Sequence, residues 1–170
     1  MVCRMQETEL NFTSPKSGFQ LFSKVRVSKP FVENRSVVLH RISIYAVWDT
    51  GAAVSAISRR AAERLGMRKY ERSVLATATG ALSTFNDIVL LDLFIDDYLI
   101  PIQAAVVDSI PGVSNDFLIG MDIIQCGDLS VSTDHAACEF KINFKPYSGM
   151  FKPLADILRM SNNGNAIDDR

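Results

Sequence analysis

Apolar and polar residues alternate over much of the chain, with the short period that is typical of half-buried strands. The stretches "FQLFSKVRV" (residues 19–27) and "VVLHRISIYAV" (residues 37–47) both alternate in this way. The apolar runs at residues 88–95 and 98–108 flank Asp96-Asp97, a pair that favours a tight turn, so they predict a hairpin. Within its second strand, Pro101 is expected near a sheet edge, because proline cannot donate a backbone hydrogen bond.

Further strands are expected at residues 115–120 and 135–144, and helices are expected to be few and short. In "SRRAAERLG", Ser58 is a suitable N-cap and Gly66 a suitable stop. The segment "MDIIQC" (residues 121–126) predicts one helical turn. These patterns predict a mainly β domain with one or two short helices.

The length and composition fit one globular domain with polar ends. The chain has 170 residues, of which 48% are hydrophobic and 22% charged, enough to form a core without disulfides. We expect an N-terminal extension that is flexible over residues 1–18, a folded domain over residues 19–147, and a polar, partly disordered tail over residues 148–170.

The charge balance gives no reason to expect a nucleic acid or a membrane as partner. Lys and Arg total 18 against 19 for Asp and Glu, a net charge of -1, so the chain lacks the excess positive charge that such partners attract. No stretch approaches the ~18 apolar residues of a membrane helix, and the N-terminus lacks a signal-peptide core.

Cysteine and histidine usage predicts neither a disulfide framework nor a metal site. Cys3, Cys126 and Cys138 are odd in number and widely spaced, which favours a reducing compartment, and we expect the cytoplasm. His40 and His135 lie far apart without acidic or thiol neighbours at metal-binding spacing. Neither a metal nor a cofactor is expected.

The most informative motif is Asp49-Thr50-Gly51, which directly follows an apolar, strand-like run. Alone, the triplet fits an ordinary turn after a strand, because Asp and Gly both favour turns. Two other elements give it context. Residues 73–84, rich in small and β-branched residues around Gly80, predict an extended hairpin, and "FLIGMD" (residues 117–122) places an apolar pair before a Gly and a helical turn.

Together these elements resemble the retropepsin-like aspartic proteases, the single-domain peptidases of retroviruses and of their cellular and bacterial relatives. The matching pieces are "VWDTGAAVSAIS" (residues 47–58), "ATATGALST" (residues 76–84) at the flap position and "FLIGMDII" (residues 117–124). The order and spacing also match, over residues 36–144. The resemblance implies an all-β, closed, barrel-like acid-protease fold with a flap hairpin, and aspartic endopeptidase activity.

By this resemblance, Asp49 is the reacting carboxylate, Thr50 positions the loop and reaches the partner subunit's loop, and Gly51 leaves the approach to the carboxylate open. An extended peptide would lie between the floor of the site and the flap. The expected substrate-binding residues are Ala52, Ala53, Ala78, Thr79, Gly80, Ala81 and Leu82, with the flap tip at residues 79–82.

A single triplet raises a question of stoichiometry. Peptide hydrolysis of this type uses two carboxylates about 3 Å apart that share one proton. Because the chain carries the triplet once, the resemblance implies a homodimer in which Asp49 meets its symmetry mate. The segments at residues 19–27 and 135–144 are candidates for completing the subunit contact.

The chain departs from the retroviral pattern at two places. Met121-Asp122 follows the second Gly where retroviral members carry Arg, a form closer to the cellular and bacterial branch, and the flap has one Gly instead of several. We interpret Asp122 as an early-helix carboxylate favoured by the helix dipole, not as a second catalytic group.

The positive charges that follow Ser58 are interpreted as a solvated face. The side chain of Trp48 should point away from that of Asp49, because neighbouring side chains of a strand alternate between its two faces.

Two alternatives to a protease acting on other proteins remain open. One is a catalytically silent peptide-binding or assembly module with the same fold, and the other is a protease whose target is its own chain ends.

Overall fold

The structure is a computed structural model that describes residues 8–15, 20–30, 41–68, 73–76, 82–85, 87–96, 98–110, 115–133, 137–144 and 152–153. In these ranges the strands are β1 (Thr8–Pro15), β2 (Leu21–Ser28), β3 (Ile42–Trp48), β4 (Ala56–Ser58), β5 (Ser73–Ala76), β6 (Leu82–Phe85), β7 (Ile88–Ile95), β8 (Tyr98–Val107), β9 (Asn115–Ile119), β10 (Gly127–Thr133), β11 (Ala137–Phe144) and β12 (Lys152–Pro153). The helices are α1 (Arg59–Arg64) and α2 (Met121–Ile124).

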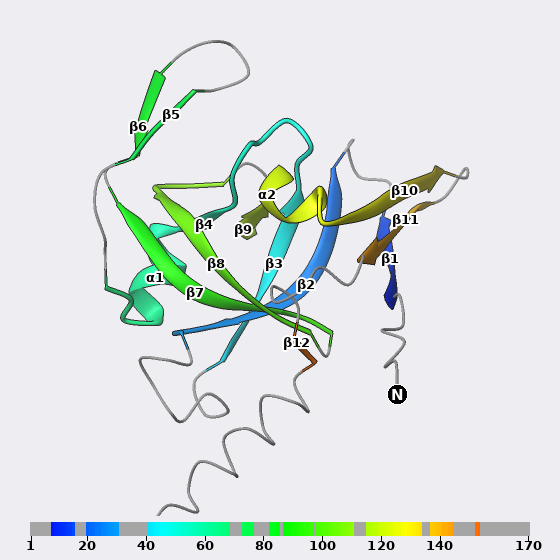
Figure 1. The fold of residues 1–170 in the computed structure, drawn as a ribbon, viewed down its shortest axis with the longest axis horizontal. Helices are drawn as coiled ribbons and strands as arrows, with labels where there is room; N and C mark the ends of the chain where they lie inside the picture. The colour runs from blue at the N-terminus through cyan, green and yellow to red at the C-terminus, as the bar shows by residue number, and fades with distance from the viewer. Residues whose placement is uncertain are drawn as a thin grey trace, which may run out of the picture.

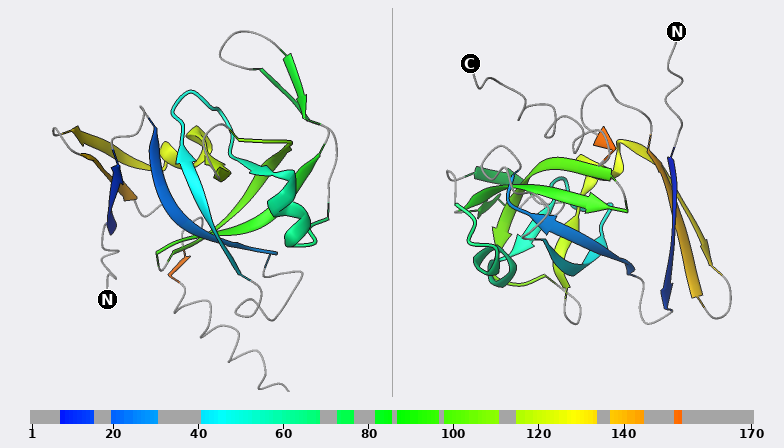
Figure 2. Two further views of the ribbon diagram at one scale, coloured as in Figure 1. Left: turned by 180° about the vertical axis from the view of Figure 1, so that it is seen from behind. Right: turned by 90° about the horizontal axis from the view of Figure 1, so that it is seen from below.

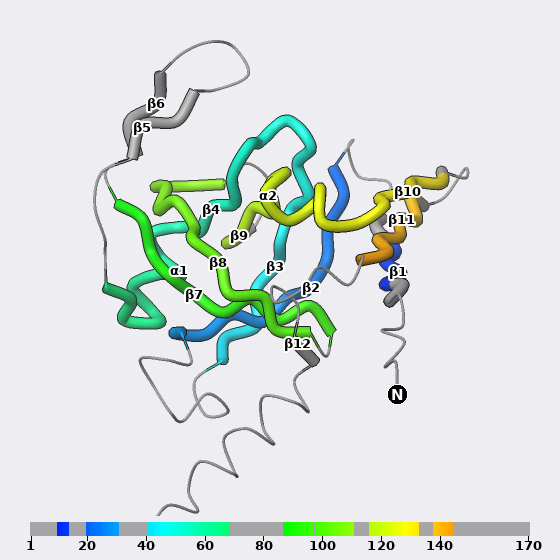
Figure 3. Tube along the Cα trace, in the orientation of Figure 1, coloured from blue at the N-terminus to red at the C-terminus, as the bar shows by residue number. Residues whose placement is uncertain are grey.

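Six strands form a closed barrel. Their order is β8-β4-β9-β3-β2-β7, and an antiparallel pairing of β7 with β8 along their lengths closes the ring (Figure 1). The inward positions are buried apolar side chains such as Val27, Leu93, Ile100 and Phe117. The prediction of a mainly β, closed, barrel-like fold is therefore confirmed, and Figure 3 shows the path of the chain around the barrel.

Strand β9 has a special place in the barrel because it joins two parts of the chain that are distant in sequence. It pairs in parallel with β3 and antiparallel with β4, and so lies between the strand that precedes Asp49 and the strand that follows it. Ala46, Val47 and Trp48 lie opposite Phe117, Leu118 and Ile119. The segment around Asp49 is therefore a loop whose two ends are attached to the same strand.

A second, three-stranded sheet stands beside the barrel, with the order β1-β11-β10 (Figures 1 and 2). Strand β1 lies inside the expected N-terminal extension and was not predicted. It pairs with all eight residues of β11, from Thr8 opposite Phe144 to Pro15 opposite Ala137. Because Leu10 is buried in the core, this part of the extension belongs to the folded unit.

Aromatic side chains join this sheet to the barrel. Phe12 stacks on Phe140 with ring centroids 4.9 Å apart, and both rings contact the indole of Trp48 at centroid distances of 5.7 and 5.5 Å. The indole N–H donates to Ser23 Oγ at 2.8 Å, so the polar end of this buried side chain is satisfied. The joint therefore fixes the end of β3 against both layers.

Helix α1 begins and ends as predicted. The Ser58 side chain accepts a hydrogen bond from the Ala61 N–H at 3.1 Å, and Gly66 has a positive φ of 58° just after the helix.

The basic residues of this region are not all free in solvent, because Arg59 pairs with Asp87 and Asp108.

The two predicted hairpins are also present. Strands β7 and β8 meet at Asp96, which has a positive φ of 51° that Asp tolerates in a tight turn. On one side, Pro101 of β8 pairs with β7. On the other side of β8, residues before Pro101 pair with β12 and residues after it pair with β4, but Pro101 itself has no partner strand there in the described part of the chain. The missing N–H of Pro101 is therefore tolerated, as expected. Strands β5 and β6 pair from Ser73 to Phe85.

Several expectations fall outside the described residues, namely the flap tip expected at residues 79–82 except for Leu82, the start of the strand expected at residues 37–47, and the tail after residue 153. Three short strands were missed besides β1, and they are β4, β10 and β12. None of the helices in the described ranges is long and apolar enough to span a bilayer.

The ion pair between the buried Asp116 and the exposed Arg60 makes a pH dependence testable. Burial alone would raise the pKa of Asp116, but hydrogen bonds from Ser58 and Arg60, together with the charges of Arg60 and Arg64, outweigh it and lower the pKa. A depressed pKa stabilises the fold at pH values above the ordinary Asp value, and this stabilisation is lost as the pH falls through and below about 4.

We therefore expect Asp116→Asn to reduce the free energy of unfolding by about 2 kcal/mol at neutral pH, the usual cost of losing charged hydrogen bonds. Between about pH 6 and about pH 3, stability should fall less steeply in the variant than in the parent chain. Urea unfolding at several pH values measures both effects. Asp108→Asn is the control, because the exposed ion pair of Asp108 with Arg59 contributes little to stability. If the unfolding free energy of all three chains falls equally steeply with pH, Asp116 is not the source of the pH dependence.

Candidate active site

Asp49 lies at the point where β3 leaves the barrel. Its N–H donates to the Ile119 carbonyl at 3.0 Å, which continues the pairing of β3 with β9 by one residue. The chain then turns, and the Ala52 N–H donates back to the Asp49 carbonyl at 3.2 Å. Asp49 is half-buried, whereas Thr50 and Gly51 are exposed at the outer side of the turn.

The carboxylate of Asp49 is oriented by its own loop. The Gly51 N–H donates to Asp49 Oδ1 at 2.8 Å, a charge-assisted hydrogen bond that fixes the position of this oxygen. A Cβ atom at position 51 would lie 3.2 Å from the same oxygen, tighter than ordinary contact. A side chain at position 51 would therefore crowd the Asp49 carboxylate, which glycine avoids.

A buried polar clamp holds the far end of the loop. Ser55 is fully buried, and its N–H and hydroxyl donate to the two carboxylate oxygens of Asp122 at 2.9 and 2.7 Å. The Ser55 hydroxyl oxygen also accepts from the Gly120 N–H at 3.1 Å. Asp122 does lie in the first turn of α2, as interpreted, but its larger role is to hold this loop.

The loop also packs directly on the start of α2. The Met121 N–H donates to the Ala52 carbonyl at 2.8 Å. A Cβ on Gly120 would lie 2.6 Å from the carbonyl carbon of Val54 and 2.7 Å from the Val54 carbonyl oxygen, both closer than real Cβ atoms come to backbone. The Gly in "FLIG" is thus required by the close approach of two backbones.

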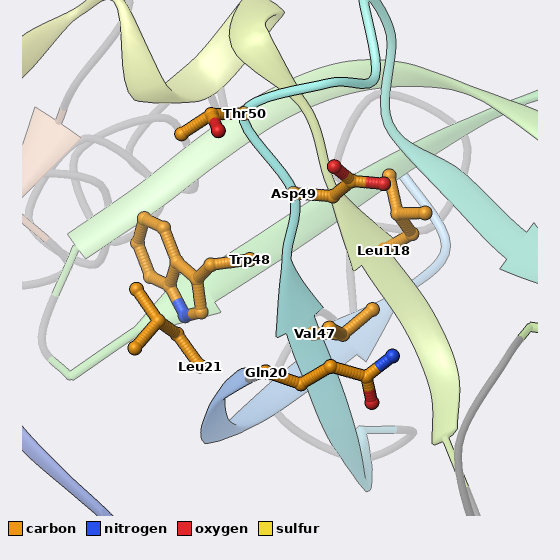
Figure 4. A pocket seen from close by; sticks show the side chains of 7 residues that line it. All are labelled: Gln20, Leu21, Val47, Trp48, Asp49, Thr50 and Leu118. Atoms are coloured by element: carbon orange, nitrogen blue, oxygen red, sulfur yellow. The ribbon is translucent and has the colours of Figure 1, made fainter. Parts of the chain in front are cut away.

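An open pocket of about 310 Å³ lies against Asp49. It is lined by Gln20, Leu21, Val47, Trp48, Asp49, Thr50 and Leu118 (Figure 4). The lining mixes apolar side chains, from Leu21, Val47, Trp48 and Leu118, with polar ones, and Asp49 is its only carboxylate within the described part of the chain. The pocket can hold an apolar side chain of a ligand next to the carboxylate.

Figure 4 shows that the side chains of Val47 and Asp49 leave β3 on one side and that of Trp48 on the other. The prediction that Trp48 points away from the carboxylate is confirmed, and its role is packing, although its edge also lines the pocket. The same alternation could have identified Val47, two residues before Asp49, and Leu118, between the buried Phe117 and Ile119. No pattern in the sequence indicated that Gln20 lines the pocket.

The other expected site residues are only partly visible. Ala52 is half-buried and Ala53 exposed in the loop after Asp49. Ala78, Thr79, Gly80 and Ala81 lie outside the described residues, and Leu82 begins β6. Within the described ranges, no group of three or more His, Cys, Asp or Glu side chains could hold a metal ion.

Comparison with protein families shows to which family the chain belongs. Residues 37–126, just over half of its length, match the family described as gag-polyprotein putative aspartyl protease, a segment that includes Asp49, the β5–β6 hairpin and Gly120. The chain belongs to this family, and its fold is that of the retropepsin-like aspartic proteases.

Solved structures give distant similarities. A retropepsin-like aspartic protease from Rickettsia conorii is 14% identical, with 85% of this chain and 100% of that chain covered and a TM-score of 0.49. The retroviral protease-like domain of Ddi1 from Leishmania major is 17% identical, with 75% and 96% covered and a TM-score of 0.37. None of the curated proteins compared with the chain matches it.

The Ser55–Asp122 clamp can be tested by its effect on stability. Asp122→Ala would leave the buried Ser55 N–H and hydroxyl without their acceptor, which we expect to reduce the free energy of unfolding by about 2–4 kcal/mol. Asp122→Asn keeps one oxygen acceptor and should lose less. Denaturant unfolding gives the loss of unfolding free energy for these two variants, for Ser55→Ala and for the double variant Ser55→Ala/Asp122→Ala. If the loss in the double variant equals the sum of the losses in Ser55→Ala and Asp122→Ala, the two residues do not act together.

Proposed function

We propose that the protein is an aspartic endopeptidase that acts as a homodimer, in which two Asp49 carboxylates activate one water molecule. The observation that carries the proposal is the pocket at Asp49. It combines several apolar side chains with one oriented carboxylate, whereas the chemistry of this family requires two carboxylates about 3 Å apart. A second copy of the chain supplies the other carboxylate by symmetry.

In this proposal the two carboxylates share one proton, because like charges so close cannot both ionise. The ionised carboxylate takes a proton from the water as the water oxygen bonds to the carbonyl carbon of the peptide. The protonated carboxylate gives its proton to the carbonyl oxygen. When the tetrahedral intermediate collapses, one of its two hydroxyls gives its proton to the carboxylate that is then ionised, and the carbonyl re-forms. The C–N bond breaks and the leaving nitrogen takes the proton of the other carboxyl group, so the pair again holds one proton.

The proposed substrate is an extended segment of peptide or protein. The apolar lining from Leu21, Val47 and Leu118 favours a large apolar side chain beside the scissile bond. Main-chain contacts are proposed for Ala52 and Ala53 on the floor, and for Ala78, Thr79, Gly80, Ala81 and Leu82 in the β5–β6 hairpin acting as a flap. We also propose a cytoplasmic location, consistent with the free thiols of Cys126 and Cys138.

The decisive variant is Asp49→Asn, which removes the ionisable group and keeps its size. We expect cleavage of an unfolded protein or peptide mixture to fall by at least about 10³-fold, as for loss of a principal catalytic group. Peptide mass spectrometry with a long incubation measures the residual rate. The unfolding transition should change little, because Asp49 is half-buried and its side chain accepts a hydrogen bond from Gly51, within its own loop.

Asp108→Asn is the matched control, since it removes an exposed carboxylate far along the chain and should leave cleavage unchanged. Cleavage that survives Asp49→Asn at the parental rate would exclude the mechanism. A parent chain that forms the dimer and binds peptides without cleaving them would instead support a silent binding module.

A further inference from the structure

We propose that Arg26, Arg41 and Ser43 form a binding site for a small oxyanion, a carboxylate or a phosphate group, on the outer face of the barrel. The site lies at the end of the β2–β3 pair that is remote from the loop carrying Asp49 (Figure 1). It is separate from the candidate active site, so the inference goes beyond the proposed protease activity and does not rest on it.

The register of β2 and β3 places Arg26 and Ser43 side by side on the outside of the barrel. Val25 and Val27 are buried in the core, so the side chain of Arg26 between them points outward. Arg26 lies directly opposite Ser43. Opposite residues on neighbouring strands have Cβ atoms about 5 Å apart, so the guanidinium of Arg26 and the hydroxyl of Ser43 can contact the same ligand.

The Arg41 side chain reaches the same face and is held there by an aromatic ring. Its guanidinium carbon lies 4.2 Å from the centre of the Phe94 ring on β7. Phe94 alternates with the core residues Leu93 and Ile95 and lies opposite Arg26, so it belongs to the outer face. The cation–π contact fixes the guanidinium of Arg41 beside Arg26, but the ring gives its N–H groups no oxygen acceptor.

The hydrogen-bond donors of this cluster exceed its acceptors. The Nε atom of Arg41 is buried and has no hydrogen-bond partner in the described part of the chain. Arg26 donates through Nη2 to the Asp96 carbonyl at 2.6 Å, which orients its guanidinium and uses only one of its five N–H groups. Guanidinium groups that are held in place with unused donors match the oxygens of carboxylates and phosphates.

The charge of the cluster is also unbalanced. Burial and the positive charge of Arg26 both lower the pKa of Arg41, although arginine stays protonated. Asp92 and Asp96 lie two positions before and after Phe94, yet among the described residues neither forms an ion pair with the two arginines. A negative ligand between the guanidinium groups would replace their repulsion with two attractions, which selects an anion over a neutral ligand.

An oxyanion can reach this cluster from solvent. Ser43 is exposed, and Arg26 and Arg41 are each half-buried. Lys24, two residues before Arg26, is exposed as well and adds positive charge to the same face. The bound oxyanion would accept hydrogen bonds from both guanidinium groups and from the Ser43 hydroxyl. When the Arg41 guanidinium turns its edge towards the ligand, the Nε–H gains the acceptor that it lacks.

The first test is an NMR titration of the ¹⁵N-labelled parent chain with sodium phosphate, at an ionic strength kept constant with sodium chloride. We expect the Arg41 Nε–H signal to shift and to saturate, because this group gains an acceptor. Arg41→Lys, which lacks the signal, identifies it. A parallel titration with sodium acetate shows whether the site prefers a phosphate or a carboxylate. An Arg41 signal that responds to neither anion would overturn the inference.

Variants locate the site, with binding measured from the backbone amide signals of β2 and β3. Arg41→Gln and Arg26→Gln should each weaken phosphate binding at least tenfold, because each removes a charge and several donors. Ser43→Ala removes an exposed hydroxyl without disturbing the core and should weaken binding about threefold, as for one hydrogen bond. Arg68→Gln is the matched control, since it removes one positive charge at an exposed position and should leave binding unchanged.

Two further results would contradict the inference. Equal weakening by Arg68→Gln and Arg41→Gln would show a general effect of net charge instead of a site. Loss of phosphate binding in Asp49→Asn would place the anion in the pocket at Asp49. The protease function can fail without changing these expectations, because a chain that cleaves no peptide should still bind the anion through Arg26 and Arg41.

Discussion

The site depends on one close approach between backbones. Where β9 ends, Gly120 lies so near Val54 and Ala52 that no side chain fits between them. This contact lets β9 hold both ends of the Asp49 loop, through the Ile119 carbonyl at the start and the Ser55 side chain at the end. A loop of exposed, small residues is thereby held by hydrogen bonds to a buried strand, and the Asp49 carboxylate has a defined direction without support from a large side chain.

The hydrogen bonds between Ser55 and Asp122 beneath the loop mainly hold the loop in one conformation. Ser55 is fully buried, so its hydroxyl and N–H would be costly without acceptors, and Asp122 supplies both. The aromatic joint of Phe12, Phe140 and Trp48 has the corresponding effect on the other side, where it fixes the end of β3 against the three-stranded sheet. The reactive segment is held between a polar clamp and an apolar joint, while its outer surface remains accessible.

The sequence allowed most of the barrel strands and the caps of α1 to be predicted because their signals are local, whereas the three-residue strand β4 was missed. Alternation identified β7 and β8, and Ser58 and Gly66 marked a helix. Strands β1 and β10 were missed for a physical reason. In β10 the alternating pattern is short, because only Leu129 and Val131 alternate with polar residues. In β1, Leu10 and Phe12 can be recognised as core residues only when the pairing of β1 with β11 is known. The Ser55–Asp122 clamp spans 67 positions, a separation for which a single sequence carries no signal.

Trp48 has a consequence for the study of this molecule in solution. It is the only tryptophan in the chain, and it contacts at once the pocket, the end of β3 and the aromatic rings of the second sheet. Its emission therefore comes from one known place, where an incoming ligand and a separation of the two layers would each alter the surroundings of the indole. The fold thus carries an intrinsic fluorescent reporter next to its reactive carboxylate, which needs no added label.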